Sequence, residues 1–547
     1  MSRLSRLPAA VSKPGGLSRP PAAVSKPRVD QPVSIRALEG ATQPALPLWA
    51  ALLLAAASGP VMDAAFPDQG IWPLAFVAAA MVLVALIGRR ACSAFLVAFV
   101  AGLAFYLLHI QWASLFLGLL PMTALAFLES LFVGLGGVAI ALAYRWMPRA
   151  WPTPLGRLAL LPIAIAGLWT AREAWSAVWP YGGFSWGRLA MSQSDSPLSS
   201  LFPWLGISGT SFVMVLLAAA SIEAVRFAGV PRLVRATAVV ALGVVLVGLP
   251  AWPTATDGTM RVAAAQGNGK AGYFDGSSAN DLLQAQYDAT APLFGQKDID
   301  VVLWPEGTTY ADPLTDHYTG QVFDYVSEKM DAPLIAQGVT HRDGVYYNTA
   351  VLWQAGEGAL DLYDKKHPVP FGEYIPDRAF WRPFAPDLID LIQREYTPGT
   401  TDNVFDVNGI TVGINICFDI VDDQILTESV EEGAQVIFAS SNTADFGHTD
   451  ESAQQLAIAR IRAMELGRSV VNISTVGLSA VIAPDGTIVQ QLPWFSVGTM
   501  VQDVALSTAI TPAVLLGRQL EWFVAGLGLA SILIAGLTTR KRRRARP

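Results

Sequence analysis

The sequence predicts a polytopic α-helical membrane domain joined to an α/β domain. Of the 547 residues, 52% are hydrophobic and only 15% are charged, whereas charged residues make up roughly 25% of a soluble domain. The apolar residues are concentrated in residues 46–252 and again in 518–537. Between these two regions, short apolar runs alternate with amphipathic stretches, as in folds that cover a sheet with helices.

Residues 1–45 are rich in Pro, Ser, Ala and Arg and contain a near-repeat. Such a composition cannot bury a core, so we expect a disordered basic tail on the cytoplasmic side. No apolar segment typical of a cleavable secretory signal lies near the start.

Seven apolar stretches follow, most of them close to the about 20 residues that a helix needs to cross a bilayer. They lie at 46–62, 71–88, 91–112, 118–146, 157–178, 205–225 and 234–252. With an eighth at 518–537, we expect about eight spans. The alternative, core helices of a large soluble protein, is disfavoured because so many long runs follow one another.

The loops that alternate along these spans differ in charge. Basic residues gather between spans two and three, four and five, and six and seven, at Arg89, Arg90, Arg145, Arg149, Arg157, Arg226, Arg232 and Arg235. A second basic tail, residues 538–547, follows the last span. By the positive-inside rule both termini are cytoplasmic, and residues 258–512 lie on the extracytoplasmic face of a multi-pass membrane protein.

The domain formed by residues 258–512 alternates expected strands and helices. Strands are expected at 260–266, 300–304, 332–338, 346–354, 360–363, 410–416, 435–439, 469–474, 479–483 and 487–491. Helices are expected at 278–293 and 451–467. This alternation predicts sheets covered by helices.

Three polar residues each follow an apolar strand: Glu306, Lys365 and Cys417. Sites in α/β folds are assembled at strand ends. A desolvated carboxylate can take the proton of a thiol, and a lysine beside both can hold the oxyanion of a tetrahedral intermediate. Taken singly, each residue also fits an ordinary structural role, and the adjacent Lys366 leaves open which lysine points inward.

The strand over 410–416 ends on Cys417 and is followed by a helix-like segment. Asp419, Asp422 and Asp423 would lie in the first turn of that helix. We therefore expect the thiol at a helix N-terminus, where the N–H groups and the helix dipole favour a thiolate. The alternative is a cysteine that serves as a small core hydrophobe.

The remaining composition argues against metal and nucleic-acid binding. The only other cysteine, Cys92, lies in an apolar run, so no disulfide is expected. No CxxC or His-rich pattern is present. A net charge of −7 and an isoelectric point of 5.4, without a basic groove, give no indication of a nucleic-acid partner.

Several motifs resemble the nitrilase superfamily (the carbon-nitrogen hydrolases) and, within it, the bacterial apolipoprotein N-acyltransferases. They are Trp304-Pro305-Glu306, Lys365 with the string His367 to Pro376, Ile416-Cys417-Phe418-Asp419, Ser441-Asn442 through Phe446-Gly447, and the helix 455–468. The resemblance implies an extracytoplasmic αββα sandwich, held between a seventh and an eighth span in the inner or plasma membrane of a bacterium.

The resemblance also implies roles for individual residues. It implies a Glu306–Lys365–Cys417 triad supported by Glu373, and supporting or substrate-binding roles for Trp304, Phe418, Asp419 and Asn442. Phe418 and Asp419 stand where the family usually has Tyr and Glu. Three further departures replace a usual Leu, Asp and Trp: Pro368, Thr443 and Asp445.

In the implied reaction, Cys417 takes an acyl chain from a phospholipid as a thioester. The α-amine of an apolipoprotein's N-terminal diacylglyceryl-cysteine then accepts it. No cofactor or metal is required, and a monomer in contact with membrane lipid is expected. The runner-up is a membrane-anchored nitrilase-like amidase. A third class, a scaffold or transporter, is disfavoured by the triad, although Glu129 and Glu173 are intramembrane charges to check.

Two aromatic segments leave alternatives open. The loop 379–392, with Phe380, Trp381 and Phe384, either dips into lipid and gates entry of acyl chains or packs on the domain's own core. The connection between spans five and six is either an interfacial aromatic belt or a lipid-facing wall beneath the outer domain.

Overall fold

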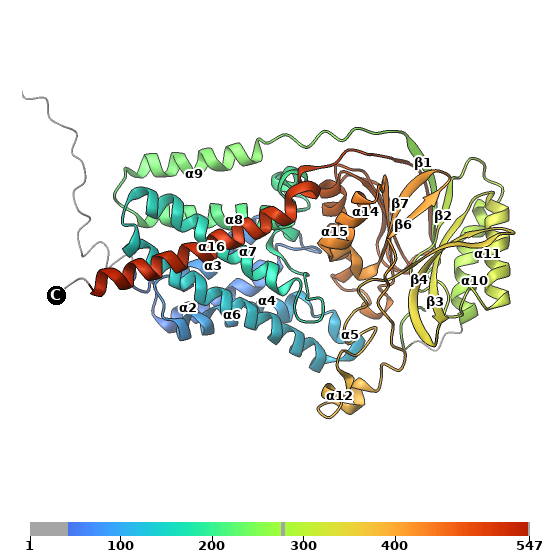
Figure 1. The fold of residues 1–547 in the computed structure, drawn as a ribbon, viewed down its shortest axis with the longest axis horizontal. Helices are drawn as coiled ribbons and strands as arrows, with labels where there is room; N and C mark the ends of the chain where they lie inside the picture. The colour runs from blue at the N-terminus through green and yellow to red at the C-terminus, as the bar shows by residue number, and fades with distance from the viewer. Residues whose placement is uncertain (1–41, 275–278, 545–547) are drawn as a thin grey trace, which may run out of the picture.

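The computed structural model describes residues 42–274 and 279–544, which form a helical bundle beside a two-sheet domain (Figure 1). Of the expected disordered tail, residues 1–45, the part up to residue 41 lies outside the described residues. The end of the second basic tail, residues 545–547, also lies outside them.

Each of the eight predicted apolar stretches contains a helix. The bundle comprises α2 (Leu48–Asp63), α3 (Pro73–Leu86), α4 (Ala91–His109), α5 (Ala113–Leu117), α6 (Leu119–Ala150), α7 (Leu161–Ser176), α8 (Phe202–Arg226), α9 (Arg232–Val247) and α16 (Pro512–Arg544). Within the described residues, α4, α6, α8 and α16 are long and apolar enough to cross a membrane, and α2 and α3 are shorter apolar helices.

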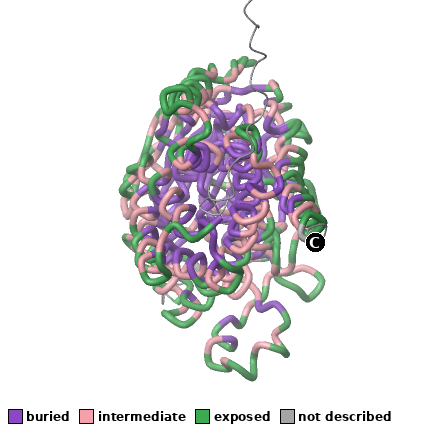
Figure 2. Tube along the Cα trace, turned by 90° about the vertical axis from the view of Figure 1, so that its left-hand side faces the viewer, coloured by how far each residue is buried: buried purple, intermediate pink, exposed green. Residues whose placement is uncertain are grey.

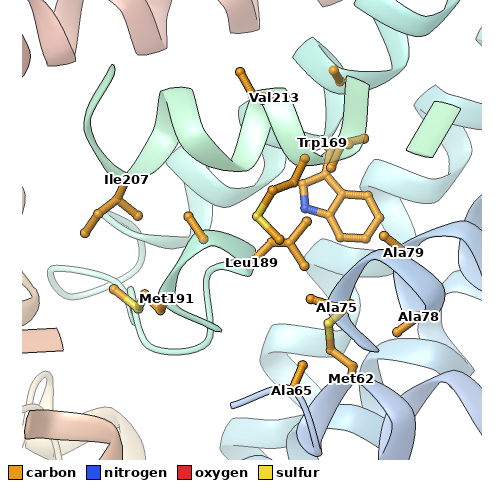
Figure 3. Packing of buried hydrophobic residues seen from close by; sticks show 14 of the residues in the cluster. Met62, Ala65, Ala75, Ala78, Ala79, Trp169, Leu189, Met191, Ile207 and Val213 are labelled. Carbon is orange, nitrogen blue, oxygen red and sulfur yellow. The ribbon is translucent and has the colours of Figure 1, made fainter. Parts of the chain in front are cut away.

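Small residues let the bundle helices approach one another closely. A Cβ added at Gly137 of α6 would lie 2.2 Å from Ala98 Cβ of α4, and one at Gly167 of α7 would lie 2.3 Å from the Val524 carbonyl of α16. Close approach at small residues is the usual packing of membrane helices. Larger side chains such as Trp169 and Leu189 fill the space between α2, α3, α7 and α8 (Figure 3).

Helices α9 and α16 differ from the other helices, the first in its burial and the second in its bounds. No residue of α9 is buried, because this helix lies along α8 at the outside of the bundle (Figure 1). Helix α16 begins at Pro512, before the expected 518, and continues to Arg544. The basic residues after 537 thus extend the last helix as far as the structure describes them.

The second domain contains two six-stranded sheets, ordered β12-β1-β2-β3-β4-β5 and β11-β10-β9-β8-β7-β6. The first sheet comprises β1 (Thr259–Gln266), β2 (Val301–Leu303), β3 (Leu334–Arg342), β4 (Val345–Gln354), β5 (Gly358–Asp364) and β12 (Gly498–Ala505). The second comprises β6 (Val404–Val407), β7 (Ile410–Ile416), β8 (Val436–Ser441), β9 (Ser469–Ser474), β10 (Ser479–Ile482) and β11 (Ile488–Leu492). Strands β1 to β3 and β7 to β9 are parallel neighbours.

The two sheets pack face to face between two layers of helices. Side chains such as Leu303, Ile414 and Phe438 fill the core between them. Helices α10 (Ala279–Thr290) and α11 (His317–Met330) cover the outer face of the first sheet. Helices α14 (Asp423–Glu431) and α15 (Glu451–Leu466) cover the second sheet on the side of the bundle (Figure 1). This is the expected αββα sandwich.

Helix α15 fixes the sandwich to the bundle. Its Gln454 Oε1 accepts hydrogen bonds from the indoles of Trp186, at 2.7 Å, and Trp112, at 3.3 Å. Its Glu465 Oε1 accepts one from the backbone N–H of Ile207, at 3.1 Å. One cluster of buried hydrophobic residues includes side chains of both domains. Seen from the bundle end, buried residues lie in the middle of the molecule and exposed residues at its outside (Figure 2).

Candidate active site

Three strand ends bring the predicted triad together between the two sheets. Glu306 follows β2, Lys365 follows β5 and Cys417 follows β7. Lys365 Nζ lies 4.0 Å from Glu306 Oε1, and the Cys417 thiol lies close enough to both side chains for their charges to interact. Lys365 is the inward lysine, with a side chain that is 1% exposed, whereas Lys366 pairs with Glu428 nearer the surface.

Two N–H donors hold the Glu306 carboxylate, and a hydroxyl holds its backbone carbonyl. Asn348 Nδ2 donates to Oε1 at 2.8 Å, and the backbone N–H of Asn442 donates to Oε2 at 2.9 Å. The hydroxyl of Thr475 donates to the Glu306 carbonyl at 2.6 Å and so fixes the backbone. These contacts favour the ionised carboxylate, the form that can accept the thiol proton.

A second, partly buried carboxylate, Glu373, lies beside the lysine. Its Oε2 lies 2.9 Å from Lys365 Nζ and accepts from the N–H of Val369 at 2.6 Å. Asn348 Nδ2 also donates to Glu373 Oε1, at 2.9 Å, and so bridges the two glutamates. Asn348 was not singled out in the sequence, where its only signal is an amide inside the apolar strand β4.

Burial dominates the electrostatics of the triad. It raises the pKa of Glu306, while Lys365 opposes this rise. It also raises the pKa of Cys417 well above that of a free thiol, and the Glu306 charge raises it further. Burial alone would lower the pKa of Lys365, but Glu373 and Glu306 raise it. The resting thiol is therefore neutral, and the expectation of a stabilised thiolate is wrong.

The backbone at Cys417 explains that error. Cys417 has a left-handed φ of 51° and begins a short 3-10 turn that ends at Val421. Helix α14 begins only at Asp423, where the Asp422 carboxylate caps the backbone N–H groups of Gln424 and Ile425. The thiol is not at an α-helix N-terminus. It is presented by a strained turn, as is common for active-site residues.

Asp419 lies behind the thiol. Its Oδ2 accepts hydrogen bonds from the backbone N–H of Ile416 and the hydroxyl of Tyr363, both at 3.0 Å. Only 1% of the residue is exposed, and burial raises its pKa to about 7. Asp419 therefore fixes the end of β7.

Phe418 faces the bundle. Its ring is parallel to those of Phe184, at a centroid distance of 6.0 Å, and Trp186, at 6.1 Å. Both come from the connection between α7 and α8. Trp186 is buried against the sandwich, whereas Trp175 and Trp179 are about half exposed. The aromatic-belt and lipid-facing alternatives for this connection both stay predictions.

Trp304 does not reach the site, so of the two predicted roles, supporting or substrate-binding, its position fits only the supporting one. Its side chain is fully buried on the outer side of the first sheet. There it packs on Phe323 and donates to Thr290 Oγ1 at 3.0 Å. Trp304 contributes to the site only by anchoring the strand that ends at Glu306.

The apolar loop packs partly on the domain's own core, and its entry into lipid stays a prediction. It contains α12 (Arg378–Trp381) and α13 (Pro386–Ile389) and projects below the bundle end near α5 (Figure 1). Phe380 and Phe384 are 59% and 73% exposed, whereas Ile389 and Ile392 pack inward.

The two acids inside the bundle are buried. Glu173 Oε1 accepts from the Trp169 indole at 2.8 Å and from the N–H of Leu189 at 3.0 Å. It therefore holds the connection after α7 in place. Glu129 of α6 is 1% exposed.

Two family models match the chain in sequence. The Apolipoprotein N-acyltransferase N-terminal domain matches residues 58–220, and the Carbon-nitrogen hydrolase model matches residues 261–511. An apolipoprotein N-acyltransferase of Mycolicibacterium smegmatis is 32% identical over 82% of this chain and 78% of its own length. Enzymes of the same name from Pseudomonas aeruginosa and Vibrio cholerae are 29% and 28% identical, over 84% and 82% of this chain and 90% of theirs.

Among solved structures, Saccharomyces cerevisiae Nit3, a member of branch 10 of the nitrilase superfamily, is similar to 46% of this chain and 91% of its own. The TM-score is 0.36 and the sequence identity 17%.

Proposed function

The chain belongs to the apolipoprotein N-acyltransferase family, and we propose that Glu306, Lys365 and Cys417 carry out its reaction through a thioester. The protein N-acylates lipoproteins, with a phospholipid as acyl donor and the amino terminus of the lipoprotein as acceptor. The observation that carries the residue assignment is the meeting of three strand ends, which places Lys365 Nζ 4.0 Å from Glu306 and the Cys417 thiol within reach of both charges.

In the first half-reaction, Cys417 Sγ attacks an ester carbonyl of the phospholipid. Glu306 takes the thiol proton, and the Lys365 ammonium stabilises the oxyanion of the tetrahedral intermediate. The intermediate collapses, the ester C–O bond breaks, and Glu306 gives its proton to the departing lysophospholipid. An acyl chain is left on Cys417 as a thioester.

In the second half-reaction, the α-amine of the lipoprotein's diacylglyceryl-cysteine attacks the thioester carbonyl. Glu306 takes a proton from the amine and returns it to the leaving thiolate. An amide forms, the thioester C–S bond breaks, and Cys417 is again a thiol.

We further propose that the bundle crosses the membrane about eight times and holds the catalytic domain on the extracytoplasmic face of a bacterial inner or plasma membrane. Arginines gathered in alternate loops support this orientation. The exposed rings of Phe380 and Phe384 would then lie at lipid depth, where they can admit acyl chains. Family membership favours N-acylation over the amidase alternative.

The residue assignment is tested on the acyl intermediate. The purified protein is incubated with phospholipid in detergent micelles, without acceptor, and its intact mass is measured. We expect a mass increase of one acyl chain that hydroxylamine removes and that Cys417→Ala lacks. A wild-type protein that never acylates, or an adduct that persists in Cys417→Ala, would refute the assignment.

A further inference from the structure

One buried acid beside the triad has no part in the mechanism above. Glu451 lies in the first turn of α15 and is 3% exposed. Its Oε2 is buried without a hydrogen-bond partner among the described residues, and no salt bridge to Glu451 is found in that part of the chain. A buried, unpaired carboxyl oxygen is costly, so it calls for a chemical explanation.

The fold brings this acid close to the reacting atoms. Glu451 lies near enough to Glu306 and to the Cys417 thiol for their charges to interact. The loop before α15 supplies the Asn442 N–H that binds Glu306. The helix start is fixed by Ser452 Oγ, which accepts from the backbone N–H of Leu478 at 2.8 Å.

The surroundings of Glu306 favour an ionised carboxylate, whereas those of Glu451 favour a neutral one. Glu306 receives two N–H donors and has Lys365 at 4.0 Å. The charged group found to act on Glu451 is Glu306, which disfavours its ionisation. Burial, and then the charge of Glu306, raise the pKa of Glu451 to about 8. In the resting site the negative charge therefore lies on Glu306, and Glu451 is a neutral acid.

In the second half-reaction the acceptor ammonium loses two protons, and Glu306 can accept only one of them. A free α-amino group has a pKa near 8, so the acceptor arrives largely as an ammonium with three N–H bonds. The amide product keeps one of them. Of the two protons lost, Glu306 moves one to the thiolate. The other must leave before the attack, because an ammonium has no lone pair.

We propose that Glu451 binds the acceptor's α-ammonium and takes this first proton, acting as a second base for the amine half-reaction alone. This inference rests on the proposed function and deepens it. The ligand class is a primary ammonium on a lipid-modified peptide.

The step balances as follows. The arriving ammonium displaces the proton of Glu451 to solvent and forms an ion pair with its carboxylate. One N–H proton then passes to Glu451, and the amine lone pair attacks the thioester carbonyl. Glu306 takes the second N–H proton and delivers it to the Cys417 sulfur as the C–S bond breaks. Glu451 ends protonated, as it began, and one proton has been released.

The test separates the two half-reactions in Glu451→Gln, which keeps the shape and neutrality of the resting acid. The thioester is first formed from phospholipid and then discharged in two ways. One acceptor is a synthetic lipopeptide with a diacylglyceryl-cysteine at its N-terminus. The other is hydroxylamine, which is uncharged at neutral pH and needs only one proton removed during the attack.

We expect Glu451→Gln to form the thioester and to react with hydroxylamine at wild-type rates. Its discharge by the lipopeptide should be slower by about 10²-fold, the smallest effect typical of a lost general base, and Glu451→Asp should recover part of the rate. The thioester itself shows that the variant is folded.

Equal loss with both acceptors would mean a purely structural role and overturn the proposal. So would lipopeptide discharge within twofold of wild type. If the wild-type protein forms no thioester at all, it is the assignment of the triad that fails.

Discussion

Replacing Lys365 by Met tests the charge on which the site depends. The change keeps the length and the apolar stem of the side chain but removes the cation that lies 2.9 Å from Glu373 and 4.0 Å from Glu306. Because these side chains are only 1%, 16% and 11% exposed, water cannot replace the lost charge fully. The variant should therefore lose both catalysis and stability.

The magnitude follows from the geometry. Two unit charges 4.0 Å apart attract each other by about 4 kcal/mol at an effective dielectric constant near 20. Losing a comparable stabilisation of the oxyanion slows thioester formation by about 10³-fold. Breaking a buried ion pair by removing one partner typically costs about 3–5 kcal/mol of folding free energy.

The neighbouring Lys366 provides a matched control. Lys366→Met breaks a partly exposed pair with Glu428, and such pairs contribute at most about 1 kcal/mol. Acylation is followed by intact-mass spectrometry over time, and stability by denaturant unfolding in detergent at several pH values. In Lys365→Met the pKa of Glu306 rises further, so the variant should lose stability more steeply than wild type as the pH increases.

Two results would refute this reasoning. Acylation by Lys365→Met within tenfold of wild type would mean that the ammonium does not stabilise the oxyanion. An equal loss of activity in Lys366→Met would mean that the pair of lysines acts through the local fold rather than through the buried charge.

Burial raises the pKa of Asp419 from 3.8 to about 7, so the folded state holds a proton that the unfolded chain has lost. The unfolding free energy of the wild type, measured by urea titration, should therefore fall between pH 4 and pH 7. In Asp419→Asn this fall should be smaller, and an equal fall in both proteins would contradict the assignment. Phe380→Ser with Phe384→Ser should leave the melting temperature unchanged but slow acylation from phospholipid vesicles. As a control, Tyr318→Ser, at an exposed site on the distant α11, should change neither the melting temperature nor the rate of acylation. Equal slowing of acylation in this control would exclude a lipid-facing role for Phe380 and Phe384. Phe418→Ala removes two ring contacts and should lower the unfolding free energy by about 1–3 kcal/mol; Phe418→Leu should lose less.

The sequence predicted those parts of the fold that follow from local patterns. Long apolar runs identified eight helices, and short β-branched runs identified ten of the twelve strands. The missed β6 is only four residues long and contains an aspartate. The dipeptide Asn408-Gly409 nevertheless marked a turn in the sequence, and both residues have positive φ angles in the structure, 54° and 84°. Asn-Gly between two apolar runs is a strong sign of a hairpin, here between β6 and β7.

The site was predictable only where a strand end marked it. Glu306, Lys365 and Cys417 each follow an apolar run, so their meeting could be inferred from the order of elements. Asn348 becomes a site residue through contacts with Glu306 and Glu373, which lie on elements far apart in the chain. The proposed site residue Glu451 also comes from a distant element, and periodicity reveals neither. The conformation of Cys417 was missed because a β-to-helix transition and a strained 3-10 turn share the same apolar–polar pattern.

Residues of both domains hold the turn that carries the thiol. Arg462 of α15 donates to the carbonyls of Ile420 and Val421, each at 2.9 Å. From the bundle side, Ser185 Oγ donates to the same Val421 carbonyl at 2.9 Å. The bundle's Trp186 also lies parallel to Phe418, the residue after the thiol. A left-handed φ at Cys417 persists only if its surroundings enforce it, and these contacts come from both sides. The helices therefore do more than anchor the catalytic domain: they complete the turn that carries Cys417, the proposed nucleophile.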